Sequence, residues 1–421
     1  MYYPRLIQKE IELKLKTSGA VLVYGPKFCG KTTTCMLYQK SYIKLNTKQR
    51  ISMARLNPWF ALEGEEPHLI DEWQTAPDIW NQIKESLDED YRFGRFILTG
   101  SSTPVDKTDI YHSGAGRITP VFMRPMSLWE SKESNGFVEL SLLFEGKKDF
   151  KWELNTPGPL ERIAFLLCRG GWPISVTANQ EIALEITKNY YNSLFIFEES
   201  DNERFRNKKP EVIKMILKSY ARNISSEAAI STIVSDVRQS NERSMDVKTF
   251  NDYLEALRDI FLIEDLQAWC PSIRSKTTIR STPTRHFVDT SIACRALNVS
   301  PSDLMADLES FGLFFEDFAV RDLRIYANYL GGEVRHYRDN TGLECDAIIL
   351  LDDGRWGAIE IKLGGEKLIE EGASNLMRLQ NKIIEKSSEK KPSFLMVLTA
   401  TSETYVREDG VIVAPITSLR P

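Results

Sequence analysis

The stretch Gly25-Pro26-Lys27-Phe28-Cys29-Gly30-Lys31-Thr32-Thr33 decides the fold of the N-terminal part of this chain. Residues 25–32 match the pattern G-x-x-x-x-G-K-T, in which backbone N–H groups turn toward a phosphate and the lysine reaches the outer phosphates. The apolar residues 20–24 before it predict a buried strand, and residues 33–38 after it predict a helix. We therefore expect residues 25–33 to bind ATP, with the Thr32 hydroxyl as a ligand of Mg²⁺.

The composition places the chain among globular proteins. Of its 421 residues 42% are hydrophobic, and no apolar run approaches the roughly 20 residues that a membrane-spanning helix needs. The six cysteines include no C-x-x-C pair, and residues 1–5 lack the apolar core of a signal peptide. We expect about two to four domains, no membrane partner and a cytoplasmic location. Since the net charge is −5, contact with DNA would depend on local basic patches.

Two acidic residues follow the next apolar strand, at residues 68–72. The carboxyl ends of parallel strands lie beside a phosphate loop, which is where ATP hydrolysis needs carboxylates. Asp71 is the expected carboxylate on the Mg²⁺ side, and Glu72 is the expected base for the attacking water. Alternation of strands and helices in this region predicts a parallel α/β sheet.

A further strand, at residues 95–102, ends in small hydroxyl residues. A hydroxyl group at this position can orient the water or contact the γ-phosphate. Ser101 is our candidate, and Thr99 and Ser102 remain close alternatives. A simple Gly-Ser turn is the structural alternative.

The order of these motifs resembles that of the AAA-type ATPases that carry a C-terminal DUF4143 region. The resemblance rests on the phosphate loop, Leu69-Ile70-Asp71-Glu72-Trp73-Gln74, Leu98-Thr99-Gly100-Ser101-Ser102, Gly116-Arg117 and Pro125-Met126-Ser127-Leu128-Trp129-Glu130. It implies that Arg117 lies near the nucleotide as an arginine finger or sensor, where a guanidinium would stabilise charge on the γ-phosphate. A structural arginine paired with an acid is the alternative. Whether Arg117 acts on its own nucleotide or on that of a neighbour in a homo-oligomer stays open.

The middle of the chain predicts helices followed by a hairpin. Residues 160–168 and 181–195 have helical spacing and predict a helical lid, and Gly170-Gly171-Trp172-Pro173 resembles a further motif of the family. Three helices and a strand pair then predict a winged helix, which serves either DNA or protein contacts. Its expected wing carries a basic patch for DNA phosphates, composed of Arg274, Lys276, Arg280 and Arg285.

The C-terminal region predicts a second site on a β-hairpin of residues 344–362. Glu360 and Lys362 are two positions apart, so their side chains lie on the same face of a strand, and Asp346 lies at the start of the partner strand. These residues resemble the D…E-x-K core of restriction-endonuclease-like nucleases, which implies that Asp346 and Glu360 hold Mg²⁺ or Mn²⁺ and that Lys362 activates water. Glu316 interrupts the apolar stripe of the preceding helix and is a further candidate for this site.

These patterns predict a multidomain α/β protein. The expected parts are an ATPase core at 1–130, a helical lid or connector at 131–209, a winged helix at 210–300 and a nuclease-like domain at 301–421. We expect an ATPase that acts on DNA and whose C-terminal site either cleaves the backbone or holds it. The alternatives are an ATP-driven switch with an inactive nuclease-like domain and an ATPase that acts on proteins.

Overall fold

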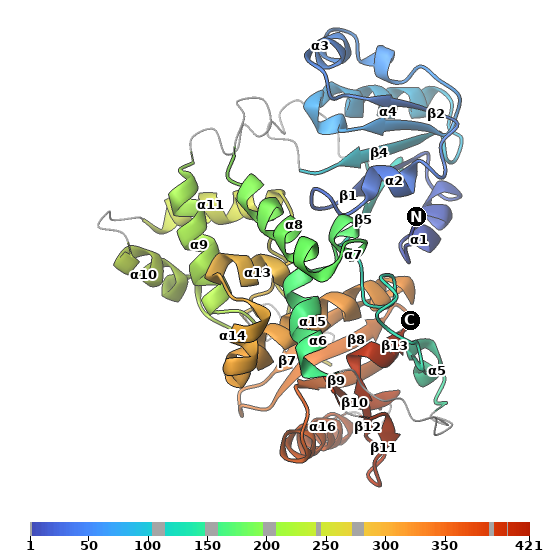
Figure 1. Ribbon diagram of the computed structural model, residues 1–421. Helices are drawn as coiled ribbons and strands as arrows, with labels where there is room; N and C mark the ends of the chain where they lie inside the picture. Colours follow the sequence, from blue (N-terminus) through green and yellow to red (C-terminus); the bar gives the residue numbers. More distant parts are fainter. Residues whose placement is uncertain are drawn as a thin grey trace. The chain divides into compact units, whose positions relative to one another are not determined.

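The computed structural model of the chain describes eight segments (Figure 1), namely residues 2–102, 114–147, 159–196, 208–240, 246–271, 282–386, 391–401 and 403–421. By their internal contacts the residues form two compact units. The first unit comprises Met1–Pro125, Ile196–Lys209 and Tyr253–Leu262, and the second comprises Met126–Phe195, Pro210–Asp252 and Ile263–Pro421. Residues Met126–Phe195 are assigned to the second unit together with the C-terminal region, and the four expected parts stay a prediction.

The first unit is built on a parallel sheet with the strand order β2-β3-β4-β1-β5. The strands are β1 (Ala20–Tyr24), β2 (Ser41–Lys44), β3 (His68–Asp71), β4 (Phe96–Gly100) and β5 (Ile118–Phe122). β3 and β4 are buried along their whole length, as expected of strands with helices on both faces of the sheet. The predicted parallel α/β core is confirmed.

In the described part of residues 1–125 this sheet is accompanied by the helices α1 (Gln8–Leu15), α2 (Lys31–Cys35), α3 (Lys48–Leu56) and α4 (Asp78–Glu89). α4 turns Ile79, Ile83 and Leu87 into a core shared with Ile70 and Leu98 of the sheet, at the i, i+4 spacing of an amphipathic helix. Because β4 lies between β1 and β3, the phosphate loop after β1 and the acids at the end of β3 lie at the same edge of the sheet.

The second unit contains a mixed sheet with the strand order β11-β12-β10-β9-β8-β7. Strands β7, β8 and β9 are antiparallel neighbours, whereas β9, β10 and β12 run parallel. A long helix precedes β7 and another connects β9 to β10. The elements are α15 (Leu308–Tyr329), β7 (Gly332–Arg338), β8 (Glu344–Leu351), β9 (Trp356–Lys362), α16 (Glu366–Lys386), β10 (Phe394–Thr399), β11 (Tyr405–Val406) and β12 (Ile412–Pro415). The predicted hairpin and both flanking helices are confirmed.

The segment that follows the ATPase core is built into this second unit. The Leu128 N–H donates to Asp322 Oδ2 of α15 (2.8 Å), and the Asn135 N–H donates to the Thr417 carbonyl oxygen (2.9 Å). Strand β6 (Val138–Glu139) pairs with β13 (Leu419–Arg420), and α5 (Leu140–Phe144) follows directly. Residues 126–147 are thus joined to the C-terminal region by hydrogen bonds and strand pairing.

A buried ion network explains the Gly-Gly-Trp-Pro motif. Arg321 of α15 donates to Asp289 and to Asp322, and all three side chains are buried. The Gly171 N–H donates to the same Asp289 carboxylate (2.8 Å). A Cβ atom on Gly171 would lie 2.1 Å from the Met126 carbonyl oxygen, so no larger residue fits there. The motif joins residues 126–130 to the core of the second unit.

The remaining helices of the second unit lie between residues 160 and 306. They are α6 (Leu160–Arg169), α7 (Pro173–Val176), α8 (Gln180–Ser193), α9 (Pro210–Arg222), α10 (Ile230–Ser240), α13 (Thr290–Leu297) and α14 (Pro301–Ala306), while α11 (Val247–Asp259) runs from this unit into the first. Antiparallel bridges join Ile263 to Phe287 and Leu266 to Thr284. Three helices and a paired segment thus occur in the predicted order, and the winged helix itself stays a prediction.

Candidate functional site

The phosphate loop has a left-handed backbone at two positions. Phe28 and Gly30 have φ values of 66° and 100°, and α2 begins at Lys31. The Lys31 ammonium donates to the carbonyl oxygens of Gly25 (2.9 Å) and Pro26 (2.7 Å). The lysine predicted to reach the outer phosphates is therefore held inside the loop that would surround them.

Asp71 meets the loop through two hydroxyl groups. Its Oδ1 atom accepts hydrogen bonds from Thr32 Oγ1 (2.8 Å) and from Thr99 Oγ1 (2.5 Å), and its side chain is buried. Thr32 and Asp71, the two residues predicted to serve Mg²⁺, thus lie in direct contact. Hydroxyl and carboxylate oxygens are the hard ligands that Mg²⁺ prefers.

Glu72 is held by two further donors. Its backbone has a left-handed conformation with φ of 62°. Its Oε2 atom accepts from Ser101 Oγ (3.1 Å) and from Gln74 Nε2 (2.5 Å). Ser101, our sequence-based candidate, therefore contacts the expected base. Gln74 lay within the motif that suggested the family, yet sequence reasoning assigned it no role.

Arg117 lies at the other end of the sheet from the phosphate loop. Its carbonyl oxygen accepts from the N–H of Ala20, the first residue of β1, and its guanidinium pairs with Asp88 of α4. The loop begins after Tyr24, and a five-residue strand spans about 16 Å. The expectation that Arg117 lies near the nucleotide of its own chain is therefore wrong. Action on a neighbouring subunit stays a prediction.

In the second unit, Asp346, Glu360 and Lys362 come together at one end of β8 and β9. The Lys362 ammonium lies 3.1 Å from Asp346 Oδ2 and 2.9 Å from Glu360 Oε2. Asp346 Oδ2 also accepts from the backbone N–H of Ile361 (2.7 Å). The last register pair before this point is Ala347 with Ile359, which sets Asp346 opposite Glu360. The side-chain arrangement predicted from D…E-x-K is present.

A residue that the sequence did not reveal completes this cluster. Asn375 of α16 donates from Nδ2 to Glu360 Oε1 (2.8 Å) and to the Glu344 carbonyl oxygen (2.6 Å). Asn375 follows Glu360 by fifteen positions and belongs to no local motif. The packing of α16 against the sheet brings it to the acid.

The electrostatics show that the acids of this cluster influence one another. Burial, reinforced by the charge of Asp346, raises the pKa of Glu360 to about 7. Burial and then Asp346 likewise raise the pKa of Glu316 on α15 well above its usual range, against the opposing effect of Lys362. Burial lowers the pKa of Lys362, but Asp346 and Glu360 together outweigh it and hold that pKa above its ordinary value. All four predicted residues therefore belong to one electrostatic group.

The cluster of Asp346, Glu360 and Lys362 is not a preformed metal site. In the part of the chain that the structure describes, no group of three or more His, Cys, Asp or Glu side chains is arranged to hold a metal ion. At Asp346 and Glu360 the ammonium of Lys362 contacts both carboxylates. A divalent ion at this site would have to share the carboxylates with Lys362.

The prediction that Arg285 contributes to a basic wing is wrong. Its guanidinium is buried, pairs with Asp265 Oδ2 (3.1 Å) and donates to the Ala228 carbonyl oxygen (2.9 Å). Arg285 is a structural arginine and does not offer its charge to DNA. Arg274, Lys276 and Arg280 lie outside the described residues.

Comparison with known families divides the chain into three parts. Residues 17–132 match the AAA domain, residues 160–303 match a domain of unknown function, DUF8612, and residues 311–419 match another, DUF4143. Together with the loop and the acids described above, the first match settles the chemistry of the N-terminal region. The protein is an ATPase. ATP and Mg²⁺ are the cofactors that an AAA-type ATPase domain implies, and Lys31, Thr32 and Asp71 provide groups that fit them.

Similar proteins are known from mycobacteria. The uncharacterized proteins Mb2031c of Mycobacterium bovis and Rv2008c of Mycobacterium tuberculosis are each 24% identical to this chain over 356 residues. The match covers 83% of this chain and 71% of each relative.

Among solved structures, the Walker-type ATPase of Pyrococcus abyssi matches 70% of this chain and 96% of its own, with 14% identity and a TM-score of 0.44. The PCH-2 structure from C. elegans matches 60% of this chain and 65% of its own, with 15% identity and a TM-score of 0.18. Among the described residues, no helix combines the length and apolar character needed to cross a membrane.

Proposed function

We propose that this ATPase acts on DNA and that Asp346, Glu360 and Lys362 form the site that engages the phosphodiester backbone. The observation that carries the proposal is the convergence of two carboxylates and one ammonium group at the ends of β8 and β9. The preceding helix, the hairpin and the following helix occur in the order that resemblance to restriction-endonuclease-like nucleases leads us to expect.

The chemistry of these groups suits phosphodiester hydrolysis. Asp346 and Glu360 would hold Mg²⁺ or Mn²⁺, and such an ion supplies an activated water molecule and stabilises charge on the phosphate. The raised pKa of Lys362 keeps its ammonium protonated at neutral pH, so it can face the negative charge that develops. Glu316 is a third carboxylate for the same group.

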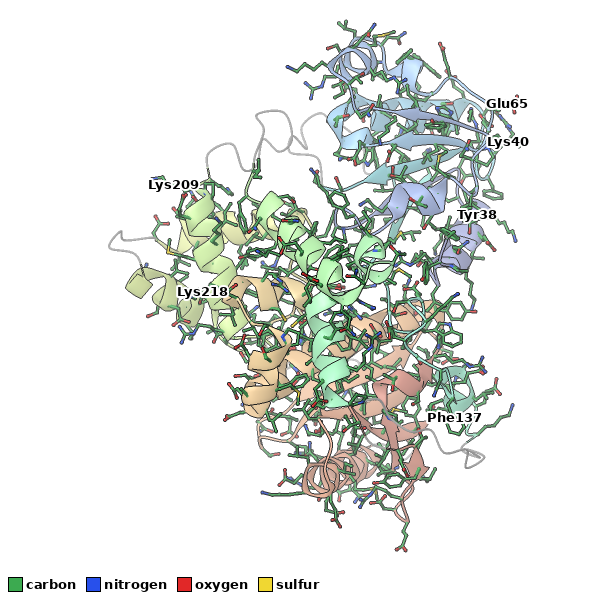
Figure 2. All side chains as sticks on the ribbon, in the orientation of Figure 1. Tyr38, Lys40, Glu65, Phe137, Lys209 and Lys218 are labelled. Carbon is green, nitrogen blue, oxygen red and sulfur yellow. The ribbon has the colours of Figure 1, made fainter. Side chains whose placement is uncertain are left out.

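The proposed DNA contact has a described basic surface on α9. Lys214, Lys218 and Arg222 are exposed and recur every four residues, which places them on one face of the helix. Figure 2 labels Lys218 on this helix. Lys214 also lies over the Phe195 ring, and Arg222 lies 3.7 Å from Asp236. The Lys214→Glu/Lys218→Glu variant should bind DNA more weakly than the wild type. The difference should be largest at low salt, where phosphate contacts contribute most.

Cleavage of labelled single-stranded, duplex and branched DNA tests the proposal directly. The reactions contain Mg²⁺ or Mn²⁺, with and without ATP, and compare the wild type with the Glu360→Ala/Lys362→Ala variant. We expect cleavage by the wild type that this variant loses. The matched control is Lys367→Ala/Glu371→Ala, an exposed pair of the same residue types on α16 that should retain activity. Equal cleavage by the wild type and the site variant would show that the nuclease activity lies elsewhere.

A second candidate function is an ATP-driven switch whose C-terminal domain holds DNA without cutting it. The contact of Lys362 with both carboxylates favours it, because the ammonium already balances charge that a metal would otherwise neutralise. In this case DNA stimulates ATP turnover at low salt, Asp346→Ala abolishes the stimulation, and no cleavage occurs with either metal. ATP turnover that DNA does not stimulate at low salt would instead favour a protein substrate.

A further inference from the structure

Two neighbouring acids at the ATPase site are each held through a single oxygen by two donors. Thr32 and Thr99 donate to Asp71 Oδ1, whereas Gln74 and Ser101 donate to Glu72 Oε2. Among the described residues, no donor reaches Glu72 Oε1. The expected base is therefore fixed at one oxygen, and the other oxygen is not engaged by these groups.

The local backbone brings Gln74 back onto Glu72. The left-handed conformation of Glu72 starts a short 3₁₀ turn, Trp73–Thr75. The Thr75 N–H and hydroxyl both donate to the Glu72 carbonyl oxygen, at 3.1 Å and 2.8 Å. The Glu72 N–H donates to the Thr99 carbonyl oxygen of β4 (3.0 Å), which anchors the turn to the sheet. The contact between Gln74 and Glu72 thus arises from a turn that is bonded at both ends.

The packing around Gln74 indicates that its position is specific. A Cβ atom on Gly100 would lie 2.9 Å from Gln74 Oε1, so the glycine at the end of β4 leaves room for the amide. Gln74 Oε1 is itself buried and has no hydrogen-bond partner among the described residues.

We propose that Gln74 is a positioning residue for ATP hydrolysis. Its amide N–H holds Glu72 Oε2, so that Oε1 accepts the proton of the attacking water. The O–H bond of water breaks, the water oxygen bonds to the γ-phosphorus, and the bond from that phosphorus to the β–γ bridging oxygen breaks, leaving ADP and inorganic phosphate. A rotated carboxylate would misplace the base, and a displacement of about 1 Å can reduce a rate about 100-fold. The inference rests on the assignment of Glu72 as the base.

Steady-state ATP turnover by Gln74→Glu tests this role, because the substitution keeps the shape of the side chain and removes the donor. We expect kcat to fall about 10- to 100-fold while KM for ATP and the Kd for ADP stay within about twofold. Gln82→Glu is the matched control, since Gln82 lies on α4 of the same unit and its amide bonds to Glu85. Gln74→Met, which lacks the charge, replaces Gln74→Glu if that variant does not fold.

The same substitution in a Glu72→Gln background separates positioning from a general structural effect. If Gln74 acts through Glu72, then Gln74→Glu has little further effect on the residual turnover of Glu72→Gln. An equal loss in both backgrounds, an unchanged kcat, or a loss of ADP binding would overturn the inference. Normal turnover by Glu72→Gln alone would overturn the assignment of the base, and the role of Gln74 with it.

Discussion

Two pairs of acids in this protein, Asp71 with Glu72 and Asp346 with Glu360, are held by different kinds of donor. In the first unit the donors are neutral, namely the hydroxyls of threonine and serine and the amide of Gln74. In the second unit the ammonium of Lys362 contacts both carboxylates, and the amide of Asn375 adds a neutral bond to Glu360.

This difference affects what each site can bind. Neutral donors orient the Asp71 carboxylate without placing beside it a positive charge that would repel Mg²⁺. Lys362 orients Asp346 and Glu360 and also balances part of their charge. The first site is thus prepared for a cation, whereas at the second any cation would compete with the ammonium of Lys362.

The largest effect should follow from Glu72→Gln. This change keeps the shape of the side chain but removes the proton acceptor, so we expect ATP to bind and turnover to fall about 100- to 10,000-fold. ATP binding and steady-state phosphate release measure the two properties separately. Glu85→Gln on the exposed face of α4 is the control and should hydrolyse ATP normally. An unchanged kcat in Glu72→Gln would place the base on another residue.

A buried pair of acids that shares a single cation should affect the stability of the fold. Asp289 and Asp322 are both paired with Arg321, which is 2% exposed. Arg321→Leu leaves two buried carboxylates without their cation and should lower the free energy of unfolding by about 3–5 kcal/mol. Urea unfolding monitored by circular dichroism measures the loss, with Arg335→Leu on β7 as the control. A decrease of less than 1 kcal/mol would mean that the network contributes no more than a surface ion pair.

Two buried histidines, one in each unit, differ in their hydrogen bonds, and one of them should make stability depend on pH. The ring nitrogens of His68 in the first unit bond to Ser41 and to the Ala61 carbonyl oxygen, whereas His336 Nε2 in the second has no partner among the described residues. Burial first, then the nearby His286, lowers the pKa of His336 from its ordinary value of 6.5 to about 4.

The unfolded chain binds a proton at His336 more readily than the folded protein does. The contribution of neutral His336 to stability is therefore present above pH 6.5 and is lost as the pH falls toward 4. The loss should amount to about 3 kcal/mol at most. His336→Gln should therefore show a smaller decline in urea midpoint between pH 7 and pH 5 than the wild type. The same decline in both proteins would assign the pH dependence to other groups.

The smallest expected effect concerns the ammonium of Lys362. Lys362→Gln removes the positive charge that competes for Asp346 and Glu360, so the affinity for Mn²⁺ in the absence of nucleotide should rise about tenfold, or about 1.4 kcal/mol. Electron paramagnetic resonance of free Mn²⁺ measures this affinity. Lys367→Gln, an exposed lysine on α16, should leave it unchanged. Weaker Mn²⁺ binding in Lys362→Gln would show that the lysine supports the metal site.

The strands and helices that carry both sites could be predicted because their signals are local. The phosphate loop, the strand that ends at Asp71 and the hairpin that carries Asp346 and Glu360 occur where sequence patterns place them. Residues 126–147 were less predictable, because they owe their place to bonds with Asp322 and Thr417, nearly 200 or more positions away. No periodicity over a short window records such contacts.

The sequence by itself determined the phosphate loop, the acids beside it and the D…E-x-K pattern, since each depends on residues that are close along the chain. The tertiary structure alone decided that Arg117 lies at the far end of the sheet and that Arg285 is buried against Asp265. It also selected Asn375 as a donor to Glu360. The physical reason is that strand order, burial and side-chain pairing depend on which distant segments pack together.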